Sequence, residues 1–185
     1  VRSRGLGDVY KRQASDISPD SKGGVNVFIH YSTSGRSELI SKDYETGKAV
    51  SGSVPSISDD GNKIAFCSFS DRLVQNDKNN LWDIFIWERS SPLLKRISMT
   101  ASGGERNQGT ESSSRIVAPS WSGDGKYVVS ATTASNMVAG DKNAMQDGMI
   151  YNTSGGNVRR MSTKGSADSN GDSPNSQGEK IGVSY

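Results

Sequence analysis

The sequence of 185 residues has few of the residues on which many folds and active sites depend. It contains one cysteine, Cys67, so no disulfide can join two parts of the chain. Such cysteine usage suits either a reducing compartment or a cysteine-poor bacterial envelope protein. Hydrophobic residues make up 32% and aromatic residues 7%, which is little material for a core. No run of 18 apolar residues occurs, so we expect no transmembrane segment.

Recognisable catalytic motifs are also missing. The sequence has no G-x-S-x-G nucleophile elbow, no H-E-x-x-H zinc motif, no P-loop and no G-x-G-x-x-G dinucleotide fingerprint. His30 is the only histidine, so a Ser-His-Asp triad would have to use it. We therefore predict that the chain is not an enzyme, with no catalytic residues and no bound organic cofactor.

The first thirteen residues, VRSRGLGDVYKRQ, hold a large share of the positive charge. They include four basic residues and one acidic residue, so without them the net charge falls from +2 to −1. The run 8–13 looks like a translated transposon-based sequencing adapter. We interpret residues 1–13 as an unstructured library scar, with a basic N-terminal arm as the alternative. No basic stripe remains elsewhere, and we expect no nucleic-acid partner.

An internal repeat organises the rest of the sequence. Residues 55–98 align with residues 119–162 at an offset of 64 without a gap, and 14 of the 44 positions are identical. The identities include Pro55/Pro119, Asp60/Asp124, Gly61/Gly125, Asp77/Asp141, Asn79/Asn143, Asp83/Asp147 and Ser98/Ser162. Partial copies flank the two units: Asn26 and Ser41 match Asp83 and Ser98 upstream, and residues 178–185 match 61–68 downstream.

Each unit predicts four short strands. In the first full unit these are residues 56–58, 63–69, 83–88 and 95–99, with a hairpin turn at 59–62 and a turn at 90–92. Helix formers do not cluster with a period of 3.6. Both faces of the second strand are apolar, with Ile64 and Phe66 on one face and Ala65 and Cys67 on the other. Such a sheet must be sandwiched between neighbours, as in a propeller blade; an open β-solenoid is the second choice.

The sequence therefore predicts an all-β chain that forms part of a β-propeller with four-stranded antiparallel blades. We expect a partial blade at 14–54, complete blades at 55–118 and 119–173, and the start of another at 174–185. His30 stands in the strand position that Trp87 and Tyr151 occupy in later units, which indicates packing. Cys67 aligns with Ala131, as a small buried residue would.

The loop before the third strand of each unit is the best candidate site in the sequence. It carries the pattern Asp-x-Asn-x-x-x-Asp, as Asp77, Asn79 and Asp83 and again as Asp141, Asn143 and Asp147. These oxygens are candidate Ca²⁺ ligands. The alternative that we favour is structural: Asp77 caps the turn, Asn79 takes a left-handed backbone and Asp83 accepts amide hydrogens. An apolar residue, Leu81 or Met145, would then anchor each loop to the core.

The segments PSISDDGNKIAF (55–66), DKNNLWDIFIW (77–87) and RIS (96–98) together resemble the WD40-like (PD40) repeats of TolB-type propellers. The Leu-Val-x-x-Asp-x-Asn loop at 73–79 is similar to a bacterial variant of that repeat. The resemblance implies six to eight blades and a periplasmic or extracellular location. Function is not fixed by such a fold. We expect a non-catalytic module that binds protein or glycan. The alternative is the propeller domain of a larger hydrolase, such as a prolyl-oligopeptidase-like serine peptidase.

Overall fold

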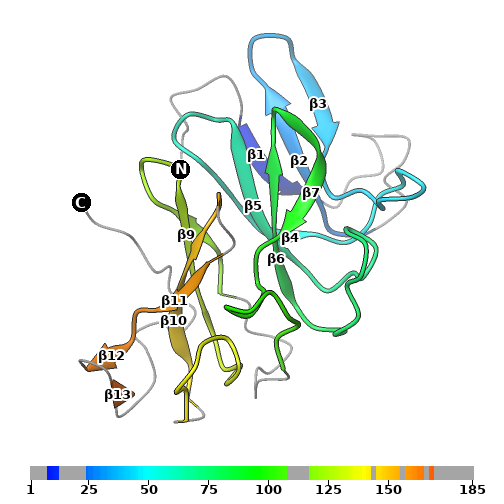
Figure 1. Ribbon diagram of the computed structural model, residues 1–185. Helices are drawn as coiled ribbons and strands as arrows, with labels where there is room; N and C mark the ends of the chain where they lie inside the picture. Colours follow the sequence, from blue (N-terminus) through cyan, green and yellow to red (C-terminus); the bar gives the residue numbers. More distant parts are fainter. Residues whose placement is uncertain are drawn as a thin grey trace.

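Short strands rich in β-branched and aromatic residues account for all the regular structure in the part of the chain that the computed structural model describes, namely residues 8–12, 24–107, 117–142, 145–154, 157–164 and 167–168. Three sheets stand side by side (Figure 1). Their strands are β1 (Asp8–Arg12), β2 (Asn26–Tyr31) and β3 (Arg36–Leu39); β4 (Ser53–Ile57), β5 (Lys63–Ser68), β6 (Asp83–Glu88) and β7 (Ser91–Arg96); and β8 (Ser120–Trp121), β9 (Tyr127–Thr132), β10 (Asp147–Asn152) and β11 (Val158–Arg160). A further pair, β12 (Thr163–Lys164) and β13 (Ala167–Asp168), follows β11.

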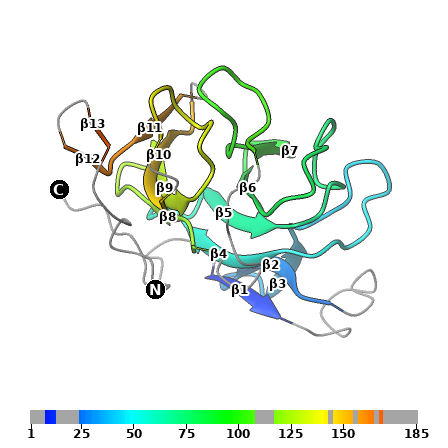
Figure 2. The same cartoon turned by 90° about the horizontal axis from the view of Figure 1, so that it is seen from below.

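The sheet β4–β7 is buried on both faces because it lies between the other two (Figure 2). On one face, Ile64 and Phe66 pack against residues of β2 such as Val27 and Ile29. On the other face, Ala65 and Cys67 belong to a cluster that includes residues of β9 and β10. This confirms the predicted pair of four-stranded antiparallel sheets stacked face to face, as in successive propeller blades.

The Ser-x-Asp-Gly segments form the predicted hairpin turns between β4 and β5 and between β8 and β9. In the first, the Ser58 hydroxyl donates to Asp60 (2.6 Å) and accepts the Lys63 amide (3.0 Å), which closes the turn from inside. Gly61 has φ +70°, in the left-handed region that favours glycine. The Ser122 turn repeats both hydrogen bonds at the same lengths.

Strand pairing keeps one register at matching positions of the three units. Phe28 pairs with Leu39, Phe85 with Arg96 and Met149 with Arg160, each at the same place in its unit. These pairs follow the alignment that the sequence predicts, in which Asn26 matches Asp83 and Asp83 matches Asp147. Equivalent positions can be compared directly up to Ile86; beyond it the second unit shifts register, and Glu88 pairs with Ser91 whereas Tyr31 pairs with Arg36.

Two strand boundaries differ from the prediction. Strand β7 begins at Ser91 and ends at Arg96, earlier than the expected 95–99, and so takes in Pro92. Proline is tolerated there because β7 is the edge strand of its sheet. Strand β4 begins at Ser53 and is irregular between Ser53 and Ser56, where Val54 has φ +44°.

The expectation that residues 1–13 are unstructured is wrong for residues 8–12. Strand β1 pairs antiparallel with the whole of β2 except its last residue, from Asp8 opposite His30 to Arg12 opposite Asn26. It occupies the place that β5 holds beside β6 in the next sheet. The origin of this segment as an adapter scar remains a prediction. The expected blade start at 174–185 lies outside the described residues.

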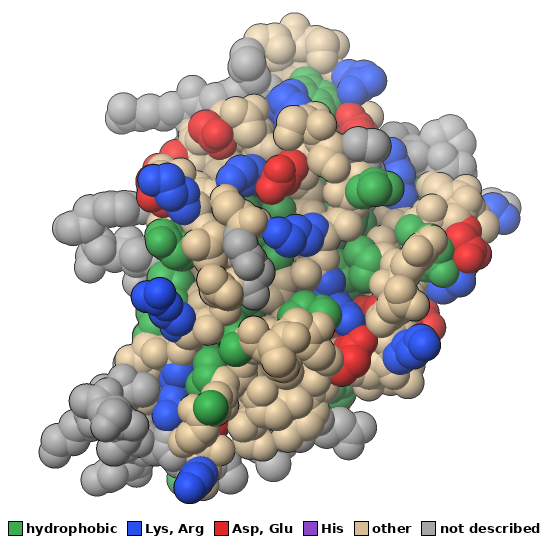
Figure 3. Space-filling model, in the orientation of Figure 1, with side chains coloured by type: hydrophobic (Ala, Val, Ile, Leu, Met, Phe, Trp, Pro, Cys, Tyr) green, Lys and Arg blue, Asp and Glu red, His purple; other side chains and the backbone are tan. Residues whose placement is uncertain are grey.

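The described residues include no helix long and apolar enough to cross a membrane. On the face shown in Figure 3, basic and acidic side chains are interspersed, so neither sign dominates the surface that is visible there.

Candidate functional site

The Asp77–Asp83 loop is closed by its own amide side chain. Asn79 accepts the Leu81 amide at Oδ1 (2.9 Å) and donates from Nδ2 to Asp83 Oδ2 (2.8 Å). The left-handed residues are Asn76 (φ +63°), just before the loop, and Asn80 (φ +53°), within it, and not Asn79 as predicted. Asparagine tolerates this backbone better than most residues do. Asn79 therefore tethers the loop to the start of β6.

Both aspartates of the loop face a buried arginine from β7. The Arg96 Nη1 atom lies 2.6 Å from Asp77 Oδ1 and 3.4 Å from Asp83 Oδ2, and Nη2 donates to Glu105 (2.6 Å). The side chains of Arg96, Asp77 and Asp83 are at most 6% exposed. Burial, with the Asp83 charge in addition, raises the pKa of Asp77 to about 6 despite the nearby guanidinium.

Asp83 is held from a second side by β7 and the segment that follows it. Its Oδ1 accepts the hydroxyl of Ser98, and the Ser98 oxygen in turn accepts the amide of Ile84 (2.9 Å). The Arg106 Nε atom lies 3.5 Å from the same Oδ1. The prediction that Asp83 itself accepts amide hydrogens is therefore replaced by a relay, in which a serine hydroxyl stands between the carboxylate and the strand.

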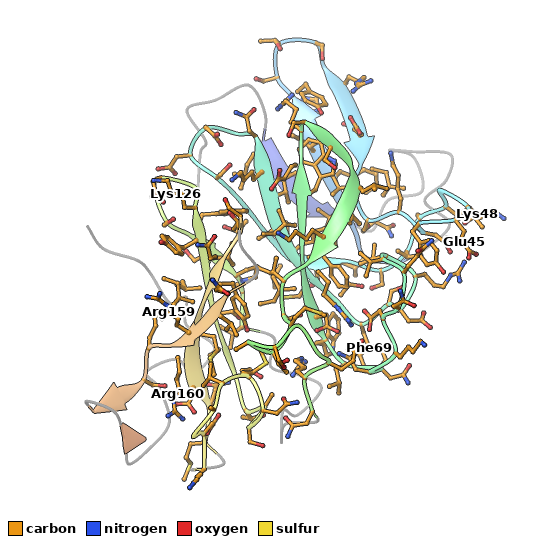
Figure 4. All side chains as sticks on the ribbon, in the orientation of Figure 1. Glu45, Lys48, Phe69, Lys126, Arg159 and Arg160 are labelled. Atoms are coloured by element: carbon orange, nitrogen blue, oxygen red, sulfur yellow. The ribbon has the colours of Figure 1, made fainter. Side chains whose placement is uncertain are left out.

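The third unit builds the same cluster. Arg160 Nη1 lies 3.2 Å from Asp141 and 3.6 Å from Asp147. Ser162 donates to Asp147 and accepts the Gly148 amide (3.2 Å). Figure 4 shows Arg160 at the end of the blade opposite to Lys126, which lies beside the hairpin turn. Asn143 lies outside the described residues, so its predicted role has no structural counterpart here.

The first unit keeps the serine and replaces both charges. Ser41 accepts the Val27 amide (3.0 Å), in the place of Ser98 and Ile84. Asn26 stands where Asp83 does and donates to the Val50 carbonyl (2.9 Å), while Leu39 stands where Arg96 does. The positions of Asp83 and Arg96 are thus charged in two units and neutral in the first, where Asp20, outside the described residues, aligns with Asp77.

These contacts bear on the calcium hypothesis. The carboxylates of Asp77 and Asp83 are directed at guanidinium, amide and hydroxyl donors, which are the partners of a structural cluster. Among the described residues, no three His, Cys, Asp or Glu side chains are grouped as a metal site requires. Whether the loops respond to Ca²⁺ stays a question for the experiment given below.

The apolar anchors of the loops are not the predicted ones. Met145 is 41% exposed and Leu81 only half-buried, whereas Leu73 and Met137, near the other end of each loop, are almost wholly buried. The internal repeat could have identified the arginine and serine of each cluster, which the sequence analysis did not name as site residues. Arg96/Arg160 is an identical pair in the alignment of the second and third units, and the same is true of Ser98/Ser162.

His30 and Cys67 lie where a packing role would put them. His30 is half-buried in β2, and its Nδ1 lies 3.1 Å from the Ser37 hydroxyl on β3. Cys67 is 2% exposed, in the core between the second and third sheets, with Sγ 3.9 Å from the Val117 carbonyl.

A second candidate site, which sequence reasoning missed, is a crevice between the first two sheets. We call it the Tyr31 crevice. It has a volume of about 640 Å³ and lies between β2–β3 and β6–β7, with Tyr31, Arg36, Glu38, Trp87 and Arg89 among its walls. The guanidinium carbons of Arg36 and Arg89 lie 5.2 and 4.9 Å from the centroid of the Tyr31 ring. Glu38 accepts from Arg36 (2.9 Å) and from the Tyr31 hydroxyl (3.2 Å).

The next pair of sheets has the equivalent crevice with different walls. It measures about 340 Å³ and is lined by Glu88, Leu93, Lys95, Thr153 and Ser154, among others. By the alignment of the units, these residues occupy the places of Tyr31, Arg36, Glu38, Arg89 and Ser90. The aromatic ring and both arginines are thus confined to the first crevice. This departure from the repeat could have been found by aligning the units.

Stacked four-stranded antiparallel sheets, repeated with one register, define a partial β-propeller. No family model and no curated protein matches the sequence. Among solved structures, the chain is similar to putative TolB from Agrobacterium tumefaciens, with a TM-score of 0.50 and 17% identity over 87% of this chain and 44% of that one. That likeness shows the fold alone.

Two other solved structures are similar at the same 17% identity. TolB from Acinetobacter baumannii has a TM-score of 0.48 over 89% of this chain and 31% of that one. The β-propeller domain of the Trilobed protease from Pyrococcus furiosus has a TM-score of 0.49 over 83% of this chain and 38% of that one. The chain spans less than half the length of each of the three.

Proposed function

We propose that the chain is a non-catalytic interaction module, part of a six- to eight-bladed propeller of WD40-like (PD40) repeats with the bacterial Leu-Val-x-x-Asp-x-Asn loop. Its partner is a protein or a glycan, and its location is periplasmic or extracellular. The proposal includes no metal, cofactor or nucleic acid.

One observation carries this proposal: the polar residues that repeat between units are buried and bind one another. Asp77, Asp83, Arg96 and Ser98 contact one another in a buried cluster, and their counterparts in the third unit have the same arrangement. The residues that break the repeat instead face solvent in the Tyr31 crevice. The repeated residues stabilise the blades, and the residues that differ between units give the Tyr31 crevice an aromatic ring and two arginines that the equivalent crevice lacks.

The test separates binding from catalysis. The complete reading frame should be recovered, and the purified protein assayed for hydrolysis of fluorogenic peptides and p-nitrophenyl esters. We expect no turnover above that of a blank. A hydrolase domain beyond the last blade, with a G-x-S-x-G motif, would establish the alternative instead. Turnover by this chain that disappears in His30→Ala would make the propeller itself catalytic and refute the proposal.

A further inference from the structure

The Tyr31 crevice combines two arginines, a glutamate and a tyrosine ring. Arg89 donates from Nη2 to the Gly61 carbonyl (3.1 Å), and no described carboxylate forms an ion pair with it. The Arg36 side chain pairs with Glu38 yet is 67% exposed. Both guanidinium groups lie near the same tyrosine ring, and both arginines line the same crevice. Two arginines against one glutamate leave a net positive charge at the mouth.

The walls supply hydrogen-bonding groups of a second kind. Thr33 and Ser34, in the turn between β2 and β3, line the crevice together with Ser90 and Ser91, and all four carry a hydroxyl. Trp87, 8% exposed, adds an aromatic surface. A volume of about 640 Å³ is within the usual range for a small-molecule site and suits one or two ring-sized units.

We propose that the Tyr31 crevice binds an acidic oligosaccharide through a uronate unit. A uronate offers a carboxylate for the arginines, hydroxyls for the serine and threonine side chains, and an apolar ring face for an aromatic wall. An extended acidic peptide is the competing ligand, because peptides bind along free strand edges and β3 and β7 are edge strands. The hydroxyl-bearing residues of the walls favour the uronate. The assignment rests on the proposed binding function and names its ligand class.

The repeat provides an internal control for this assignment. The equivalent crevice has Thr153 in place of Arg89 and Leu93 in place of Arg36, and about half the volume. Lys95 there donates to the Thr153 carbonyl (2.8 Å), so its charge serves contact between blades. The propeller scaffold therefore does not require an aromatic ring and two arginines at these positions.

The experiment is a titration of the isotopically labelled chain with tri-galacturonate, followed by NMR shifts and calorimetry. Galactotriose is the neutral counterpart, and a hexaglutamate peptide is the acidic non-sugar. We expect tri-galacturonate to bind with shifts centred on residues 31–38 and 87–91, and to bind at least tenfold more tightly than either other probe. Binding should weaken with added NaCl.

Two variants and a matched control locate the site. Arg89→Gln should weaken tri-galacturonate binding at least tenfold. Ser90→Glu places a carboxylate on an exposed turn residue without altering the Tyr31 stack, and should weaken binding to a similar extent. Lys126→Gln, which removes an exposed charge outside the crevice, should leave affinity unchanged within twofold.

Three results would overturn the assignment: no binding of tri-galacturonate, binding that both crevice variants leave intact, or tighter binding of the hexaglutamate peptide. The last would assign the crevice to acidic peptides and leave the binding function standing. Chromatography of the recovered tri-galacturonate distinguishes failure of the non-catalytic function from failure of the uronate assignment. Cleaved sugar would refute the non-catalytic function but would still show that the protein binds this sugar.

Discussion

The second and third units close their Asp loops with a buried ion pair, whereas the first unit makes the corresponding contacts with neutral side chains. All three units share a serine hydroxyl that accepts the backbone amide of the second residue of β2, β6 or β10. These residues are Val27, Ile84 and Gly148. The charges at the positions of Asp83 and Arg96 occur together or not at all, whereas the position of Asp77 is aspartate in all three units. The serine contact is therefore the common requirement of the blade, and the ion pair is a self-contained addition.

The largest expected effect comes from breaking the ion pair on one side. Asp83→Ala removes the acceptor of Ser98 and Asn79, takes one carboxylate from Arg96 and removes the Arg106 contact with that carboxylate. We expect the free energy of unfolding to fall by about 3–5 kcal/mol, more than loss of a cap would cost. Asn26→Ala in the first unit, measured by the same urea unfolding, should cost about 1 kcal/mol. Equal costs would contradict the comparison.

Removing both charges together should cost much less. Asp83→Asn with Arg96→Leu gives the second unit the residues that the first unit has at these positions. Arg96→Leu alone leaves the buried carboxylates of Asp77 and Asp83 without this guanidinium, and Asp83→Asn removes one of the two, so we expect a coupling of about 2 kcal/mol in the double-mutant cycle. Simple additivity of the two single effects would show that the charges act independently.

The serine contact should be costly wherever it is lost. Ser98→Ala leaves the Ile84 amide and one Asp83 oxygen without their partner, at about 1–3 kcal/mol. Ser41→Ala in the first unit should cost nearly as much, because the amide bond there has the same geometry. Ser90→Ala, at an exposed turn, should change the stability by less than about 0.5 kcal/mol and serves as the control.

The charged unit should also respond to pH. Since the folded-state pKa of Asp77 is raised to about 6 from 3.8, the folded protein binds this proton more tightly than the unfolded chain does. The stability that Asp77 contributes is therefore greatest below about pH 4 and is lost as the pH rises through 6. Relative to Asp77→Asn, we expect a decline on the order of 1 kcal/mol between pH 4 and 7. Asp83, Arg96 and Glu105 surround this group, and a flat difference would mean that Arg96 cancels the effect of burial.

We expect Ca²⁺ to have no effect on the stability of the protein, the smallest effect of the changes considered. Because guanidinium and hydroxyl groups already engage the loop carboxylates, neither EDTA nor added Ca²⁺ should shift the melting temperature. A calcium-dependent rise in melting temperature that disappears in Asp77→Ala would make these loops metal sites.

The sequence predicted the blades well because their determinants are local or repeated. Two-faced apolarity of the second strand predicted the sandwich, and the Asp-Gly turns predicted the hairpins. The internal repeat located the loop aspartates. The sequence did not predict which side chain pairs with each carboxylate. Arg96 and Asp77 are distant in the chain, and only the pairing of β6 with β7 brings them together. The Tyr31 crevice was missed because its walls come from two successive units, which sequence reasoning treated one at a time.

Strand β1 shows that a sheet position can be filled without the repeat sequence. Its five residues take the second place in a blade through main-chain pairing along β2, although they align with no repeat unit. Main-chain hydrogen bonds do not read side chains, so an open blade is a permissive acceptor for an extended segment. The second place in this sheet can thus be filled by a strand that lacks the repeat sequence, so the repeat is not needed to pair along β2.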